Sequence, residues 1–293
     1  MLSQKRPRQT MDTLVSTEWL SQHLDDPELV VLDCSVYQES EEGGGFHNVS
    51  GLAKYNDRHI PFAGFADLKG ELCDISSPIE FAVPTPEQFC SAMGALGVGD
   101  DSRVVLYDAS YSAWAARVWW MLRWIGFDHA AILDGGLNTW IAEERPLTTI
   151  QSKPVKKQLT LSLRPELVAD SNEVFAAIDD PAINLIDTLP AHFYRGEATL
   201  YARRGHIPGA SNICGLDLLD DSGRFRSNDE LAAVHRGNRS ARTITYCGGG
   251  IMASVNAFAM TRLGFNNVAV YTASLQEWAA DPTRPMVLET EMG

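Results

Sequence analysis

The chain has 293 residues, about twice the usual length of one domain, so we expect two domains. Hydrophobic residues make up 45% and charged residues 21%, which argues against a disordered, collagen-like or coiled-coil protein. The net charge is −14, and a surface this acidic repels nucleic acid and anionic lipid. No apolar run approaches the roughly 18 residues of a membrane-spanning helix, so neither nucleic acid nor a membrane is an expected partner.

The cysteines and the N-terminus indicate the compartment. Five cysteines form an odd set in a long chain with no secretory signal, namely Cys34, Cys73, Cys90, Cys214 and Cys247. We therefore expect free thiols and a reducing space, with the cytoplasm as the expected location and the mitochondrial matrix as an open alternative. Residues 1–11 are basic and lack an apolar centre, so we predict a disordered extension there.

Short apolar runs in chain order predict the strands. They are rich in Val and Ile without strict alternation, which is typical of strands buried on both faces. The runs are LVVLD, RVVLYD and AAILDG in the first half, and NLID, TITY and VAVY in the second.

Helix signals stand between these runs. Thr85 is followed by Pro86, the sequence from Ser227 to Glu230 is a capping box, and Gly264 has the character of a helix-terminating glycine. Alternating strands and helices predict an α/β fold with a parallel sheet in each half, flanked by helices.

The two halves repeat one another. RVVLYDAS corresponds to TITYCGGG, RWIGF to TRLGF, AAILDGGLNTW to VAVYTASLQEW, and RHIPFAG to GHIPGA. Tyr107 and Tyr246 are 139 residues apart, and Phe127 and Phe265 are 138 apart. So constant an offset indicates a duplicated domain. We place the copies at 12–148 and 166–288, joined by a linker at 149–165.

Cys247 is the main candidate for chemistry. It directly follows the run TITY and directly precedes three glycines, so it lies at the carboxyl end of a parallel strand, where open α/β sheets bind ligands. Glycines let backbone N–H groups turn inward, and the next helix, predicted at 253–262, adds its positive end. Cysteines in such positions have pKa values of roughly 3.5–7.5 instead of about 8.5, which predicts a nucleophile or sulfur carrier. The predicted binding loop is Gly248, Gly249, Gly250, Ile251 and Met252.

The loop CGGGIM, together with the blocks GHIPGA, ARVWWMLRWIGF, DGGLNTW and DLLDDSGRF, resembles the rhodanese family of sulfurtransferases over residues 16–285. The resemblance implies two tandem rhodanese-like domains, the first inactive because Asp108 occupies the cysteine position. It also implies that Cys247 takes a sulfane sulfur from a small donor, 3-mercaptopyruvate or thiosulfate, as a persulfide. The acceptor would be cyanide or a thiol, a thioredoxin-like reductant is a candidate partner, and neither metal nor organic cofactor is needed.

Several positions depart from the family pattern, and they concern the donor. Gly249 stands where the mercaptopyruvate enzymes carry a serine, and Leu189 and Phe193 stand where two arginines bind the donor carboxylate. Phe81 stands where a histidine is expected. Leu and Phe cannot replace bidentate carboxylate binding, so we expect a more apolar pocket and a bulkier or less charged donor, or a protein persulfide.

Other polar residues are candidates for supporting roles. Arg195 and Asp67 match the family pattern, and Asp187 ends its predicted strand near the site, so these three are candidates for donor binding or for support of the loop. Arg203 and Arg204 are further candidates to reach the donor. His206 of GHIPGA is expected to anchor its own loop by hydrogen bonding.

Two other functions remain as alternatives. A non-catalytic or regulatory binding module on the same frame would explain the lost serine and arginines, although it would have no need of the cysteine and its glycines. A cysteine phosphatase needs an arginine six residues after the cysteine, where Ala253 stands instead, and no arginine follows before Arg262.

Overall fold

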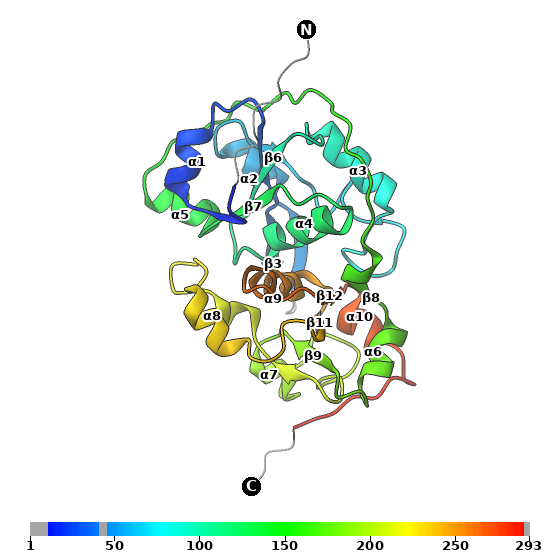
Figure 1. Cartoon of the computed structure of the whole chain (residues 1–293). Helices are drawn as coiled ribbons and strands as arrows, with labels where there is room; N and C mark the ends of the chain where they lie inside the picture. Colours follow the sequence, from blue (N-terminus) through cyan, green and yellow to red (C-terminus); the bar gives the residue numbers. More distant parts are fainter. Residues whose placement is uncertain (1–10, 41–45, 290–293) are drawn as a thin grey trace.

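The structure, a computed structural model, describes residues 11–40 and 46–289, and it contains two five-stranded parallel sheets, one in each half of the chain (Figure 1). The first sheet has the order β1-β7-β6-β2-β5 and the second the order β10-β9-β11-β12-β8, which is the same path read from the other edge. The predicted α/β fold with duplicated parallel sheets is therefore confirmed. The predicted extension lies outside the described residues except for Met11, which packs against the core of the first copy.

All six predicted strands form. The first sheet consists of β1 (Leu14–Val15), β2 (Leu29–Asp33), β5 (Gly64–Phe65), β6 (Arg103–Tyr107) and β7 (Ala130–Leu133). The second consists of β8 (Val168–Ala169), β9 (Ile183–Asp187), β10 (Ser211–Asn212), β11 (Arg242–Tyr246) and β12 (Val268–Tyr271). A separate antiparallel hairpin pairs β3 (Val36–Ser40) with β4 (Phe46–Ser50).

Helices flank both sheets. The first copy has α1 (Thr17–His23), α2 (Leu52–Asp57), α3 (Pro86–Ala95), α4 (Ala113–Trp124) and α5 (Gly136–Ala142). The second has α6 (Ser171–Ala177), α7 (Ala191–Tyr194), α8 (Asn228–Val234), α9 (Ile251–Arg262) and α10 (Ser274–Trp278), with short 3-10 turns at Pro165–Leu167 and Gly215–Leu218. No helix among the described residues is long and apolar enough to cross a membrane.

The predicted helix ends are confirmed. The Thr85 side chain accepts from the N–H of Gln88 at 3.2 Å, and Ser227 and Glu230 form the full capping box of α8. Gly264 takes a φ of +86°, as a helix-terminating glycine does. The helix after Cys247 begins at Ile251 instead of Ala253, because Gly250, with φ +77°, already turns the chain into the helix.

The two copies pack against one another along α4 and α9, in the middle of the molecule (Figure 1). Both helices are buried on nearly every side, as helices that are apolar all round must be. Trp119 of α4 meets Phe258 of α9 edge-on, with ring centroids 4.8 Å apart. A single apolar cluster runs through both copies and contains Cys247.

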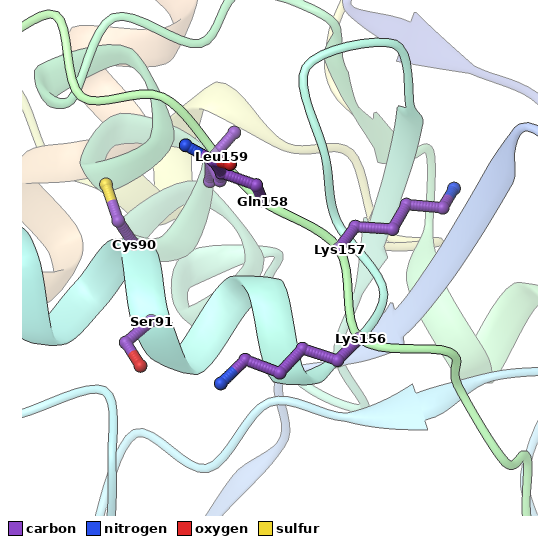
Figure 2. A pocket seen from close by; sticks show the side chains of 6 residues that line it. All are labelled: Cys90, Ser91, Lys156, Lys157, Gln158 and Leu159. Carbon is purple, nitrogen blue, oxygen red and sulfur yellow. The ribbon is translucent and has the colours of Figure 1, made fainter.

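The linker is bound along the first copy. The Lys157 N–H donates to the Gly94 carbonyl at 3.0 Å, and the Ser162 N–H donates to the Ile125 carbonyl at 2.9 Å. The linker also passes α3, where Cys90, Ser91, Lys156, Lys157, Gln158 and Leu159 line a pocket of about 340 Å³ (Figure 2). No residue of the predicted binding loop lines this pocket.

A tyrosine and a histidine anchor the same loop in each copy. The Tyr246 hydroxyl accepts from the Ile207 N–H at 3.1 Å, and Tyr107 accepts from Ile60 in the first copy at 3.4 Å. His206 Nδ1 donates to the Tyr194 carbonyl at 2.8 Å, which is the loop-anchoring bond predicted for it.

His235, at the end of α8, makes the stability of the fold depend on pH. It is buried and neither ring nitrogen has a hydrogen-bond partner, so burial lowers its pKa from 6.5 to about 4. The unfolded chain therefore binds more protons than the native state between these two values, and stability falls as the pH drops through this window. The expected loss is at most about 3 kcal/mol.

A His235→Leu variant should lose less stability between pH 7 and pH 4 than the parent in urea unfolding, with the exposed His192→Leu as control. Burial raises the pKa of Asp33 to about 6 and that of Asp187 to about 7, which has the opposite effect on acidification. The diagnostic quantity is thus the difference between variant and parent. An identical pH dependence in both would contradict the prediction.

Candidate active site

Cys247 follows β11 directly and is only 3% exposed. Its N–H donates to the Ser274 hydroxyl at 3.1 Å, and its carbonyl accepts from the Leu275 N–H at 3.1 Å. Ser274 has a φ of +51°, a conformation uncommon outside glycine, and Gly136 takes it at the same place in the first copy with φ +56°. The backbone of Cys247 is therefore fixed on both sides.

The three glycines after Cys247 are required by close contacts. A Cβ on Gly248 would collide with the Tyr201 hydroxyl, and one on Gly249 with the Gln276 amide. A Cβ on Gly250 would lie 2.7 Å from the Thr272 carbonyl oxygen, so only glycine fits there.

The first copy shows what this kind of loop binds. The Asp108 carboxylate accepts four backbone N–H groups, from Ser110 and Ser112 at 2.8 and 3.2 Å, and from Trp114 and Ala115 at 3.0 and 2.9 Å. Burial raises the pKa of Asp108, although these four donors lower it. The loop and the N-terminus of α4 together form a nest for an anion.

The loop of the second copy is one residue shorter. Residues 109–112 separate Asp108 from α4, whereas residues 248–250 separate Cys247 from α9. This deletion explains why the offset between the copies falls from 139 to 138. The N–H groups of residues 248–253 have no acceptor among the described residues, so the second nest is open beside the cysteine.

A cation from the first copy faces this nest. Arg117 of α4 is 1% exposed, and its Nη1 atom would lie 2.8 Å from a Cβ placed on Gly250. Nη2 donates to the Phe81 carbonyl at 2.9 Å. Burial lowers the pKa of Arg117 to about 10, and the nearby thiols of Cys247 and Cys73 would act against this effect if ionised.

Phe81 stands where the family pattern has a histidine, and it holds Arg117 through its backbone. Its φ of +60° is unusual for a bulky residue, and its ring packs on Trp114 with centroids 4.9 Å apart. The turn presents the carbonyl to the guanidinium, so the main chain of Phe81 contributes to the site without an ionisable side chain.

Gln276 joins the copies beside the loop. Its amide oxygen accepts from the Glu80 N–H at 2.8 Å, and its side-chain N–H donates to the Glu80 carbonyl at 3.4 Å. The Gln276 amide occupies the space where a side chain on Gly249 would lie. A serine at position 249, as in the family pattern, would therefore collide with the Gln276 amide that joins the two copies.

Tyr201 covers the loop from the segment before His206. Its hydroxyl lies against Gly248, and burial, with the charge of Cys247 as the next cause, raises its pKa. It is thus a neutral phenol next to the cysteine.

The structure separates the predicted supporting residues. Asp187 is fully buried at the end of β9 and accepts from the Leu189 N–H at 2.9 Å, with its Oδ2 unpaired. Asp67 accepts from the Ser50 hydroxyl at 3.1 Å and lines a second pocket beside α3. Arg195 lies on the surface and pairs with Glu197 at 2.6 Å.

Arg203 does not reach a donor, which corrects the prediction for it. Its guanidinium donates to four main-chain carbonyls, those of Trp278, Ala279, Asp281 and Arg284. It therefore fastens the C-terminal segment to the second copy. Arg204 is exposed.

Sequence reasoning missed Arg117, Tyr201, Ser274 and Gln276 as members of the site. Arg117 carried a signal, since it interrupts an otherwise apolar helix. Ser274 carried another, because it occupies the place of Gly136 in the repeat. Nothing in the sequence marked Tyr201 or Gln276.

Known proteins resemble this chain over most of its length. A 3-mercaptopyruvate sulfurtransferase of Escherichia coli (strain K12) is 33% identical over 278 residues, covering 93% of this chain and 96% of its own. A thiosulfate sulfurtransferase of Cricetulus griseus is 31% identical, covering 90% and 91%.

The crystal structure of SseA from Escherichia coli, described as a 3-mercaptopyruvate sulfotransferase, superposes with a TM-score of 0.79 at 31% identity, over 90% of this chain and 99% of that one. The family model described as "Rhodanese-like domain" matches residues 16–143 and again 170–281. The chain therefore belongs to the rhodanese family and carries two copies of its domain.

Proposed function

We propose that the protein is a sulfurtransferase and that Cys247 carries the sulfur as a persulfide. The observation that supports this most directly is the comparison of the two nests. Four N–H groups of the first hold the Asp108 carboxylate, whereas the matching loop of the second has open N–H groups beside a thiol. Such a loop stabilises a thiolate and a persulfide anion. The names of the relatives, both mercaptopyruvate and thiosulfate sulfurtransferases, support the same activity.

The reaction has two displacements at sulfur. The Cys247 thiolate attacks the sulfur atom that the donor gives up, and an S–S bond forms. The bond between that sulfur and the rest of the donor breaks, and its electron pair leaves with the rest of the donor, which can take up a proton from solvent. The acceptor, a thiolate or cyanide, then attacks the outer sulfur of the persulfide. The S–S bond breaks and the Cys247 thiolate returns.

The donor we propose is less anionic than 3-mercaptopyruvate, or is a persulfide on a thiol or protein. Leu189 and Phe193 replace the two arginines, and Leu189 packs against the apolar cluster that contains Cys247. Arg195 is engaged by Glu197. These residues provide no guanidinium fork for a carboxylate.

Single-turnover sulfur loading tests the proposed function. The full chain is mixed separately with thiosulfate, 3-mercaptopyruvate and an alkyl persulfide, and intact-mass spectrometry detects the addition of one sulfur atom, assigned to Cys247 by peptide mapping. We expect loading with at least one donor and its release by cyanide or thiol. Failure of all three to load Cys247 would favour a non-catalytic binding module.

The double substitution Leu189→Arg and Phe193→Arg should improve the use of 3-mercaptopyruvate. Restored bidentate binding of a carboxylate is expected to lower KM about tenfold or more, with a smaller change in kcat. Steady-state kinetics with cyanide as acceptor measure this, and Leu189→Lys with Phe193→Lys tests the need for the planar fork. An unchanged KM would contradict our assignment of these positions to the donor.

We also propose a reducing location, with the cytoplasm first, and a thiol acceptor, for which a thioredoxin-like reductant is a candidate. All five cysteines are free and buried, which fits a compartment that keeps thiols reduced.

A further inference from the structure

A buried arginine normally has a carboxylate partner, because an isolated charge in the interior is costly. Arg117 has none among the described residues. Its Nη2 bonds to the Phe81 carbonyl, its Nη1 is buried without a partner, and its guanidinium lies 5.3 Å from the centroid of the Trp120 ring. The charge of this side chain therefore needs another anion.

The acidic side chains that influence the pKa of Arg117 are two thiols, Cys247 and Cys73. Cys73 bonds to the Gly70 carbonyl at 3.5 Å, and burial, as well as the charge of Asp67, raises its pKa, so it stays a neutral thiol. Cys247 has the open nest beside it. The unpaired Nη1 lies against Gly250, the last residue of the loop that forms that nest.

The repeat shows that this cation belongs to one copy only. Arg117 corresponds to Val255 of α9, just as Asp108 corresponds to Cys247. The first copy thus has an anion in its own nest and the buried Arg117 on its helix, whereas the second has an open nest and Val255 at the matching position of its helix. The cation and the nest meet where α4 lies against α9.

We propose that Arg117 of the first copy is the counter-ion of the Cys247 thiolate and persulfide, so that the copy without a nucleophile supplies the positive charge of the active site. The proposal rests on the proposed role of Cys247 as sulfur carrier. Arg117 acts by charge and position: it stabilises the anion at sulfur, and the Phe81 carbonyl holds it in place.

Other charged groups near the site work in the opposite direction. Tyr201 lies on the loop beside Gly248, Asp187 ends β9, and Glu80 lies across the interface, where it pairs with Lys69 at 2.7 Å. The phenol of Tyr201 is neutral at ordinary pH, and the two carboxyl groups disfavour an anion at sulfur. Lys69 is engaged by Glu80, and Arg117 is the cation that lies against the loop of Cys247.

The experiment compares Arg117→Gln with Arg117→Lys in the full chain. Glutamine loses the charge but can still donate to the Phe81 carbonyl, whereas lysine keeps the charge. The rate of Cys247 alkylation by iodoacetamide is measured from pH 5 to pH 10 by peptide mass spectrometry. Arg123→Gln, on the same helix with its guanidinium over the Trp119 ring, is the control.

We expect the midpoint of the alkylation profile to move up by about one pH unit or more in Arg117→Gln, and by much less in Arg117→Lys and Arg123→Gln. An unshifted profile in folded Arg117→Gln, or equal shifts in the glutamine and lysine variants, would overturn the proposal. If the glutamine variant does not fold, Arg117→Met takes its place in the same comparison. A shift of one pH unit in Arg117→Lys, which keeps the charge, would also overturn the proposal. Alkylation needs no donor, so its outcome is separate from sulfur loading of the parent protein, on which the proposed function depends.

Discussion

Replacing Cys247 by serine should abolish sulfur transfer, with a fall in kcat of at least ~10³-fold for every donor that the parent protein uses. A hydroxyl is not ionised at neutral pH, and its oxygen cannot form and release a persulfide. The change removes little packing, because the two side chains are similar in size and the backbone bonds to Ser274 and Leu275 do not involve the sulfur. The variant should therefore fold like the parent.

Turnover to thiocyanate in the presence of cyanide is the measurement, and Cys90→Ser on α3 is the matched control. Cys90 is also buried and free, but it lies at the pocket beside the linker. The control should keep parental kcat and KM. Substantial turnover by Cys247→Ser would show that sulfur moves through another group, and the proposed mechanism would fail.

Replacing Asp108 by alanine should cause the largest loss of stability among these changes, about 3 kcal/mol in the free energy of unfolding. Four backbone N–H groups would lose their acceptor at a buried position, and each unpaired buried donor costs about 1–3 kcal/mol before relaxation or entry of water. Chemical denaturation at neutral pH measures the loss. Activity should fall less than stability, since Asp108 lies in the first nest and Cys247 in the second.

Asp108→Asn is the informative companion, because its amide oxygen can accept at one of the two positions while its NH₂ group opposes the other. Its stability should lie between those of the parent and the alanine variant. Parental stability in Asp108→Ala would mean that the four N–H groups do not depend on the carboxylate. The comparison between the nests would then lose its basis.

The fold and the position of Cys247 were accessible from the sequence because they depend on local and repeated patterns. Short Val- and Ile-rich runs, helix caps and a constant offset between the copies are properties of neighbouring residues or of duplication. The six predicted strands and the caps at Thr85 and Ser227 follow from these patterns alone. The change of the offset between the copies from 139 to 138 residues also has a structural cause, because the loop after Cys247 is one residue shorter than the loop after Asp108.

The rest of the site depends on which parts of the two copies meet. Arg117 is 130 residues before Cys247 and reaches it through the packing of α4 on α9, which no local pattern reports. Arg203 is close to the site in sequence, but four carbonyls of the C-terminal segment occupy its guanidinium. The prediction that Arg203 reaches the donor was therefore wrong.

The apolar cluster that runs through both copies has a consequence for how the protein can be divided. Cutting the chain at the linker would expose the buried faces of α4 and α9 to water and would release the hydrogen bonds of the linker to the first copy. Two domains of this kind, although duplicated in sequence, form one cooperative unit, in which unfolding of either copy exposes the apolar surface of the other. The duplication therefore produced an obligate pair, comparable to a homodimer whose subunits became unlike and were joined in one chain.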